Sequence, residues 1–354
     1  MKGRFFVIGL AALLLLQGCS ATFLNREYVT EQAHEENGLL ADTSILRADG
    51  YESLVDAILQ LVGRGGEHGV IRLYNYSGDV GACLSKACLE VKRNRPLGAY
   101  AVDYMTYDFS RIVSYYEVNL YFVYRKSYEE IKGVVAATGG SAMKEVLQGA
   151  LREFSSSAVL HIGYFEEDEA AIRAIVKKAY DATPEAAFGL PDCEISLYPE
   201  EGTDRIVEIA LTYQSHRDVL LRRQEQVKRA AELLADTAGG DSQKETVTQL
   251  YRKLKQRAAY SPTGGDTVYG ALVQRSANSE GTAMAMSLLC ETAGIPCELV
   301  RGTRGGVSWV WNRVTLDGEP VEFDPAAQMQ QGAQTPMYRP RGEMGSGYGY
   351  ETAE

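Results

Sequence analysis

The chain reads Ser279-Glu-Gly-Thr-Ala-Met-Ala-Met-Ser-Leu-Leu-Cys-Glu-Thr-Ala-Gly-Ile-Pro-Cys297 in its C-terminal third. The segments Ser308-Trp-Val-Trp-Asn312, Leu316-Asp-Gly318 and Phe323-Asp-Pro325 follow it. The first segment predicts a helix that begins at Ser279 and stops at Gly294-Ile-Pro296, because glycine and proline commonly mark helix ends. Each segment alone would be weak evidence. Their order and spacing together decide the expected fold.

This order of segments resembles the transglutaminase-like (papain-like thiol) superfamily in its bacterial form. In that family a nucleophilic cysteine opens the helix, a histidine begins a His-Ala-Trp-Asn strand, and an aspartate precedes a proline. Here Ser279 stands at the cysteine position, Trp309 at the histidine position, and only Asp324 is retained. The resemblance covers residues 245–326, with a weaker similarity in 344–349. It implies a retained scaffold without the catalytic cysteine and histidine.

The triad-equivalent residues Ser279, Trp309 and Asp324 predict a catalytically inactive domain. A helix N-terminus contributes only about 0.3–1 kcal/mol, which is too little to ionise a hydroxyl. An indole N–H donates a hydrogen bond and cannot act as the base that a histidine supplies. All four histidines precede this region: His34, His68, His161 and His216. The sequence therefore predicts a pseudoenzyme; the alternative is an active hydrolase or acyltransferase with a non-standard nucleophile.

The cysteines offer no obvious replacement nucleophile. Cys290 lies eleven residues after Ser279, about 16 Å further along a helix, where the helix dipole disfavours a thiolate. We expect Cys290 and Cys297 to be core residues. Cys83 and Cys88 could bridge if they lie in a turn, whereas a helix would point them to different faces. The chain lacks the paired cysteine or clustered histidine spacing of a metal site, and we expect no cofactor.

Two interpretations of the altered cleft remain open. In one, Trp309 fills the former cleft as core, and Asp324 caps a turn before Pro325. In the other, Ser279, Trp309, Trp311 and Asn312 line a groove that binds a peptide or glycan without cutting it.

Eight of the tyrosines between residues 74 and 124 give a second candidate surface, because aromatic rings with polar tips suit contact with sugar or protein. The alternative is that they are strand residues with no ligand. They are Tyr74, Tyr76, Tyr104, Tyr107, Tyr115, Tyr116, Tyr121 and Tyr124.

The N-terminus has the pattern of a lipoprotein leader. Lys2 and Arg4 precede the apolar run Phe5–Leu16, which is too short to span a bilayer. The run ends in Leu16-Gln-Gly-Cys19, which resembles a bacterial lipobox, with an ordinary signal peptide as the alternative. We therefore expect lipid on Cys19 to anchor an extracytoplasmic protein to the bacterial membrane. The net charge of −11 argues against a nucleic-acid partner and leaves an envelope protein, peptide or glycan as candidates.

The middle of the chain contains an internal repeat with an offset of 89 residues. Val70–Tyr76 matches Val159–Phe165, and Val118–Tyr124 matches Val207–Tyr213, at that offset. Each copy is expected to run helix, strand, helix, strand, strand. The predicted fold class is α+β, with this duplicated α-β-α-β-β region followed by the transglutaminase-like (papain-like) α+β domain.

The expected divisions of the chain follow from these patterns. They are a signal peptide (1–18), a spacer (19–48), the first repeat (49–130), the second repeat (138–215), a connecting helix (216–240), the transglutaminase-like domain (244–330) and a tail (331–354) that wraps the surface or is partly disordered.

Overall fold

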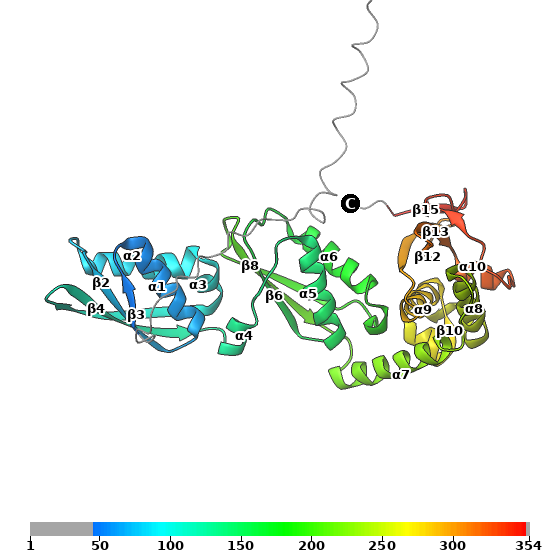
Figure 1. Cartoon of the computed structure of the whole chain (residues 1–354), viewed down its shortest axis with the longest axis horizontal. Helices are drawn as coiled ribbons and strands as arrows, with labels where there is room; N and C mark the ends of the chain where they lie inside the picture. The colour runs from blue at the N-terminus through cyan, green and yellow to red at the C-terminus, as the bar shows by residue number, and fades with distance from the viewer. Residues whose placement is uncertain (1–44, 352–354) are drawn as a thin grey trace, which may run out of the picture.

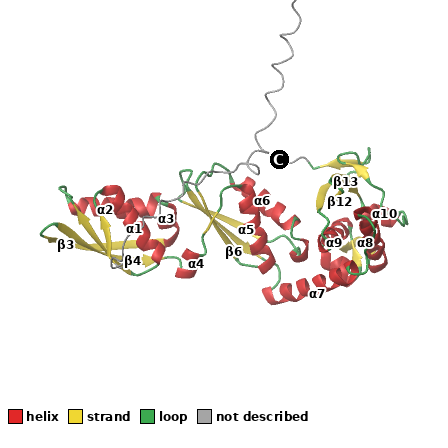
Figure 2. Ribbon diagram, viewed as in Figure 1, coloured by secondary structure: helices red, strands yellow, loops and turns green. Residues whose placement is uncertain are grey.

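The computed structural model describes residues 45–351, which form three units in a row (Figure 1). Each unit combines helices with a sheet, so the α+β prediction is confirmed (Figure 2). Cys19 and the signal peptide lie outside the described residues, as does His34. Within 45–351 no helix has the length and apolar character needed to cross a bilayer.

The first unit packs its helices on one face of a four-stranded sheet with the order β1-β2-β4-β3. Strand β1 runs parallel to β2, and the other neighbours are antiparallel. Helix α1 forms because its apolar residues recur on one stripe, which is buried against the sheet. The elements are β1 Ile45–Ala48, α1 Tyr51–Arg64, β2 His68–Tyr74, α2 Val80–Asn94, α3 Pro96–Ala101, β3 Val102–Ile112, β4 Tyr115–Tyr124 and α4 Tyr128–Lys132.

The second unit repeats this topology, with the sheet order β5-β6-β8-β7. The short strand that begins each unit was missed in the sequence, and residues 45–48 are therefore not spacer. Both short strands are edge strands held by pairing with one neighbour, which local periodicity does not reveal. The elements are β5 Val135–Ala136, α5 Gly140–Glu153, β6 Ser157–Ile162, α6 Glu169–Asp181, a 3-10 turn Pro184–Ala186, β7 Asp192–Tyr198 and β8 Arg205–Thr212.

The first unit contacts two strands of the second unit's sheet. Helix α3 contacts β7 and β8, and the Tyr100 ring meets the Tyr198 ring edge-on at 5.4 Å. Beside them the Lys126 ammonium lies 2.5 Å from a Glu208 carboxylate oxygen. The two copies therefore stack directly on each other.

The third unit builds a helical half against a five-stranded antiparallel sheet with the order β14-β13-β12-β11-β15. Residues Ala259–Gly265, which end in the pair Gly264-Gly265, form strand β9, which pairs in parallel with β10. The elements are α7 Arg217–Ala235, α8 Gln243–Arg257, β9 Ala259–Gly265, a π-helix Gly270–Gln274, β10 Ser276–Ala277, α9 Ser279–Thr292, β11 Cys297–Arg304, β12 Val307–Leu316, β13 Glu319–Phe323, α10 Pro325–Gln330, β14 Arg339–Pro340 and β15 Tyr348–Tyr350.

The tail is part of this sheet. Strand β14 pairs with β13, and β15 pairs with β11. At that contact a side chain on Gly302 would lie 2.0 Å from the Gly349 carbonyl oxygen, so the two backbones approach too closely for any other residue. The tail was expected to wrap the surface or to be partly disordered; up to Glu351 its residues are mostly exposed and contribute two edge strands to the sheet.

The cysteines of the described chain are free thiols. Cys83 and Cys88 both lie on α2, which places them on a helix and not in a turn, and both are buried.

Candidate functional site

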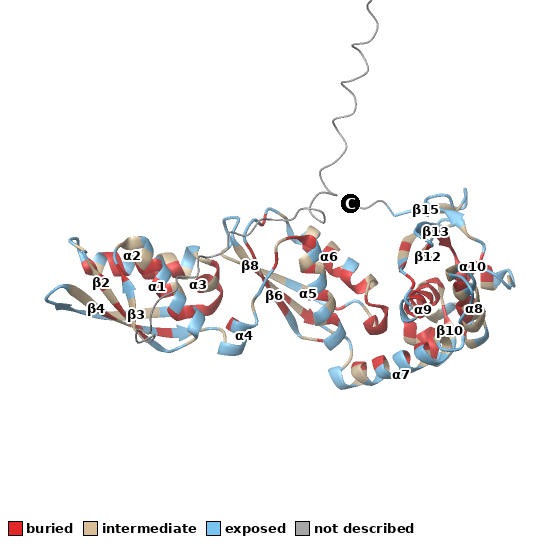
Figure 3. Cartoon of the chain, in the orientation of Figure 1, coloured by how far each residue is buried: buried red, intermediate tan, exposed pale blue. Residues whose placement is uncertain are grey.

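Helix α9 is the centre of the third unit. Asn278 caps it by accepting a hydrogen bond from the Gly281 amide at 3.1 Å, and almost every residue from Ser279 to Cys290 is buried (Figure 3). The Ser279 side chain opens the helix and is 7% exposed. Among residues 45–351 its hydroxyl has no hydrogen-bond partner that could serve as a base.

The indole of Trp309, the residue aligned in sequence with the family's histidine, has a definite hydrogen-bond partner. The Nε1–H donates to Asp324 Oδ2 at 2.6 Å. The Tyr348 hydroxyl donates to the same oxygen at 2.8 Å, and the Ala327 amide donates to Oδ1 at 2.8 Å. Burial raises the pKa of the Asp324 carboxyl, while these three donors oppose that rise. Both carboxylate oxygens of Asp324 therefore accept hydrogen bonds, and the residue also caps α10.

A second group of the same composition lies beside the first. The Trp311 Nε1–H donates to Glu322 Oε2 at 3.2 Å, and the Tyr350 hydroxyl donates to it at 2.6 Å. Arg313 binds the other oxygen at 2.8 Å through Nη2 and at 3.1 Å through Nε. Burial disfavours the charged form of Glu322, but the donors outweigh it, and the pKa of this carboxyl is lowered.

The two groups share one construction. Each takes a tryptophan from β12, a carboxylate from β13 or its end, and a tyrosine from β15. Residues two apart on a strand face the same way, so the two groups are adjacent. The tyrosines come from the tail, whose role sequence reasoning missed; the weak similarity noted in 344–349 was the only signal that pointed there.

The four residues proposed to line a groove are interior residues. Trp311 and Asn312 are completely buried, and Trp309 is 9% exposed. Asn312 donates to the Ala283 carbonyl at 2.9 Å and so connects β12 to α9. Side chains held in this way are not available to line an open groove. The hydrogen bonds and ring contacts unite Trp309 and Asp324, but none of them includes Ser279.

Ring and cation contacts also hold the Trp309 side chain in place. The Tyr260 ring lies 5.8 Å from the Trp309 ring, and the Arg304 guanidinium stacks on its face at 5.0 Å. The indole is therefore packed as well as hydrogen-bonded.

The described histidines lie in other parts of the molecule. His68 is on β2, His161 on β6 is 2.7 Å from Asp204, and His216 precedes α7. None belongs to the helices and strands from α7 onward, which contain the triad-equivalent residues. Within 45–351 no group of three or more histidine, cysteine, aspartate or glutamate residues could hold a metal ion.

Cys290 and Cys297 are buried, as expected. A hydrogen bond with Cys297 and burial raise the pKa of the Cys290 thiol, which disfavours the reactive thiolate.

The tyrosines of the first unit divide into two kinds. Tyr104 and Tyr121 are exposed, whereas the other six are half-buried. Several are held by the protein itself: Tyr107 donates to the Gly81 carbonyl, and the Arg47 and Arg72 guanidinium groups lie on the rings of Tyr74 and Tyr115. These contacts give part of the set a structural role.

One protein family matches the part of the chain that contains this site. Residues 229–325 match the family described as the transglutaminase-like superfamily. No curated protein matches the chain in sequence.

Three solved structures share weak overall similarity with this chain. A structure titled as a TGase is 14% identical, with a TM-score of 0.28, and the match covers 63% of each chain. A putative cysteine protease from Cytophaga hutchinsonii is 11% identical (TM-score 0.26, 42% of this chain and 66% of that one). A putative protease from Parabacteroides distasonis is 11% identical (TM-score 0.22, 72% and 39%). This chain thus spans less than two thirds of each of these proteins.

Proposed function

We propose, starting from the transglutaminase-like domain that this chain carries, that the protein is a membrane-anchored envelope lipoprotein whose domain binds or scaffolds and does not catalyse. Its partner would be an envelope protein, a peptide or a glycan. One observation carries the non-catalytic part of the proposal: at the position of the family's histidine, an indole N–H donates to Asp324 at 2.6 Å.

That hydrogen bond reproduces half of what a catalytic histidine does. In a working triad the imidazole donates one N–H to the aspartate and uses its other nitrogen to take a proton from the nucleophile. Trp309 makes the first contact but has no second nitrogen. A serine beside it has no group to remove its proton, and a hydroxyl at a helix start gains only about 0.3–1 kcal/mol from the dipole.

The first prediction concerns turnover. The protein should not hydrolyse activated esters or transfer acyl groups to amines above the background rate, and Ser279→Ala should change nothing. Its buried thiols should also react slowly with iodoacetamide, because burial limits access of the reagent and raises the pKa of the Cys88 and Cys290 thiols. Turnover that disappears in Ser279→Ala, or one thiol that is alkylated fast and selectively, would refute the inactive assignment.

The second prediction concerns the membrane anchor. Cys19→Ser should move the protein from the membrane fraction to the soluble fraction of cells, because it removes the thiol that would carry lipid. Cys193→Ser is the matched control, since Cys193 is a partly buried thiol of the second unit, and it should leave the protein on the membrane. Retention of the Cys19→Ser protein in the membrane would contradict lipid anchoring at that residue.

A further inference from the structure

A cleft of about 730 Å³ separates the second unit from the third. This volume lies within the ~300–1,000 Å³ of small-molecule sites, which often form between domains. One wall comes from α5 and α6, and the other from the end of α9 and the start of β11. The lining residues are Ser141, Lys144, Gln148, Arg152, Lys178, Asp181, Ala182, Glu291, Pro296, Cys297, Glu298 and Leu299.

The cleft is far from the triad-equivalent residues. Glu291 follows Ser279 by twelve residues on α9, which is about 18 Å along a helix axis. A ligand in the cleft would therefore not depend on the chemistry at Ser279.

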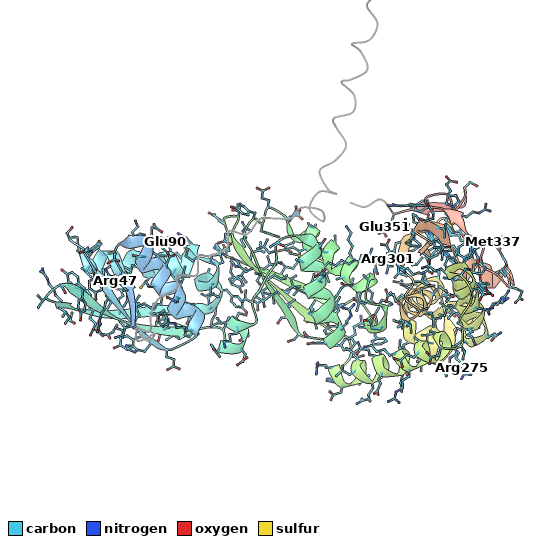
Figure 4. All side chains as sticks on the ribbon, in the orientation of Figure 1. Arg47, Glu90, Arg275, Arg301, Met337 and Glu351 are labelled. Carbon is cyan, nitrogen blue, oxygen red and sulfur yellow. The ribbon has the colours of Figure 1, made fainter. Side chains whose placement is uncertain are left out.

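Side-chain hydrogen bonds connect the second and third units beside the cleft. Arg301 of β11, which is labelled in Figure 4, donates two hydrogen bonds to Asp181 of α6, at 2.6 and 2.8 Å, and one to Glu280 of α9 at 2.7 Å. On the side of the second unit, Gln224 of α7 donates to the Arg152 carbonyl at 3.0 Å. The opening is thus braced by side chains of both units.

The two walls carry opposite charges. The wall of the second unit presents Lys144, Arg152 and Lys178, and the opposite wall presents Glu291 and Glu298. Several other charges are already paired: Arg152 with Glu185 at 2.8 Å, Asp181 with Arg301, and Glu298 with Arg313 at 3.5 Å.

Three charges remain without a partner across the described chain. Lys144, Lys178 and Glu291 line the cleft and form no ion pair with any residue in 45–351. Two ammonium groups on one wall and one carboxylate on the other thus face the same space.

Glu291 behaves as a carboxyl that lacks a cation. Glu291 is exposed to solvent at the mouth of the cleft, but surrounding protein atoms desolvate it in part. This desolvation and the nearby Glu185 carboxylate raise its pKa to about 7, and Arg152 and Lys144 oppose that rise only in part. Lys178, Asp181 and Glu298 also face this space, and the last two are paired as described. A ligand ammonium beside Glu291 would stabilise its ionised form.

We propose that this cleft binds a short peptide that carries both a free ammonium and a free carboxylate. The ammonium lies against Glu291, and the carboxylate lies against Lys144 and Lys178.

The test is calorimetric titration of the intact chain in detergent with Ala-Ala-Ala. The free tripeptide should bind at millimolar concentration or better. Its N-acetyl form and its C-terminal amide should each bind about tenfold more weakly, a change of about 1.4 kcal/mol. Binding should tighten about tenfold from pH 5.5 to pH 7.5, because Glu291 ionises over that interval while the peptide amine stays mostly protonated.

Variants assign the effect to the cleft. Glu291→Gln should weaken binding about tenfold and abolish the pH dependence, and the double variant Lys144→Gln/Lys178→Gln should weaken it at least as much. Glu232→Gln and Lys228→Gln on the exposed face of α7 are the matched controls and should bind like the wild type. No heat of binding at pH 7.5, or equal binding of the blocked peptides, would overturn the proposal. Either result would leave the assignment of an inactive triad intact.

Discussion

We expect Arg313→Ala to lower the free energy of unfolding by about 3–5 kcal/mol, the cost of leaving one partner of a buried ion pair alone. The Glu322 side chain is completely buried, and among residues 45–351 Arg313 supplies the only cation that is bound to it, through two hydrogen bonds of 2.8 and 3.1 Å. The Trp311 and Tyr350 donors would remain, but neither carries a charge.

The measurement is urea unfolding followed by tryptophan fluorescence, which reports on the third unit because both tryptophans belong to it. Arg229→Ala is the control. Arg229 forms an exposed ion pair with Glu225 on α7, so loss of that pair should lower the free energy of unfolding by less than about 1 kcal/mol. A loss for Arg313→Ala as small as that of the control would show that Glu322 does not depend on its cation.

The pH dependence of the same variant has a definite sign. In the wild type the pKa of Glu322 is lowered in the folded state, from about 4.3 in the unfolded chain. Its contribution to stability is therefore present above that value and disappears as the pH falls through the folded pKa. Without Arg313 the folded pKa rises, and we expect the acid-induced loss of stability to begin at higher pH.

We expect the second large effect from Ser279→Cys combined with Trp309→His, which should create hydrolysis of an activated ester where the wild type has none. The introduced thiol would open α9, where the helix N-terminus favours a thiolate. The introduced imidazole could donate to Asp324 as the indole now does at 2.6 Å and keep a second nitrogen for the thiol. General base catalysis of this kind contributes about 10²–10⁴-fold.

Each single substitution is a control for the double variant. Ser279→Cys alone should supply a nucleophile without a base, and Trp309→His alone a base without a good nucleophile, so both should stay near background. A third substitution, Asp324→Asn, should reduce the gain because it weakens the acceptor that orients the imidazole. The double variant could fold and yet hydrolyse no ester and react with iodoacetamide no faster than Ser279→Cys alone. That result would show that Ser279 does not face position 309.

The repeat and the elements of the third unit were predictable because their signals are local. Apolar residues with helical spacing gave α1 and α7, the Gly294-Ile-Pro296 ending gave α9, and alternation gave β4 and β8. The strands β1, β5 and β9 were missed since each is short or rich in glycine and proline and is defined by its neighbour.

The site also has features that are local in sequence and features that depend on distant elements. The identity of Ser279, Trp309 and Asp324 was readable from the order of the motif, as was the absence of histidine beyond residue 216. The sequence did not reveal that the residues of the proposed groove are buried. The burial of Trp311 and Asn312 depends on α9 and on the tail, which lie distant in sequence. The cleft could not be predicted from the sequence either, because its walls come from two distant segments, residues 141–182 and 291–299.

The sequence by itself determined which atoms are present: a hydroxyl for a thiol, an indole for an imidazole, and a carboxylate that remains. Those identities are covalent and need no fold to be known. Only the tertiary structure decided what surrounds them, because Tyr348 and Tyr350 reach the two buried carboxylates through strand pairing across some forty residues. Strand pairing and domain packing bring together groups that have no local signature, and the charge of the cleft between the second and third units arises in the same way.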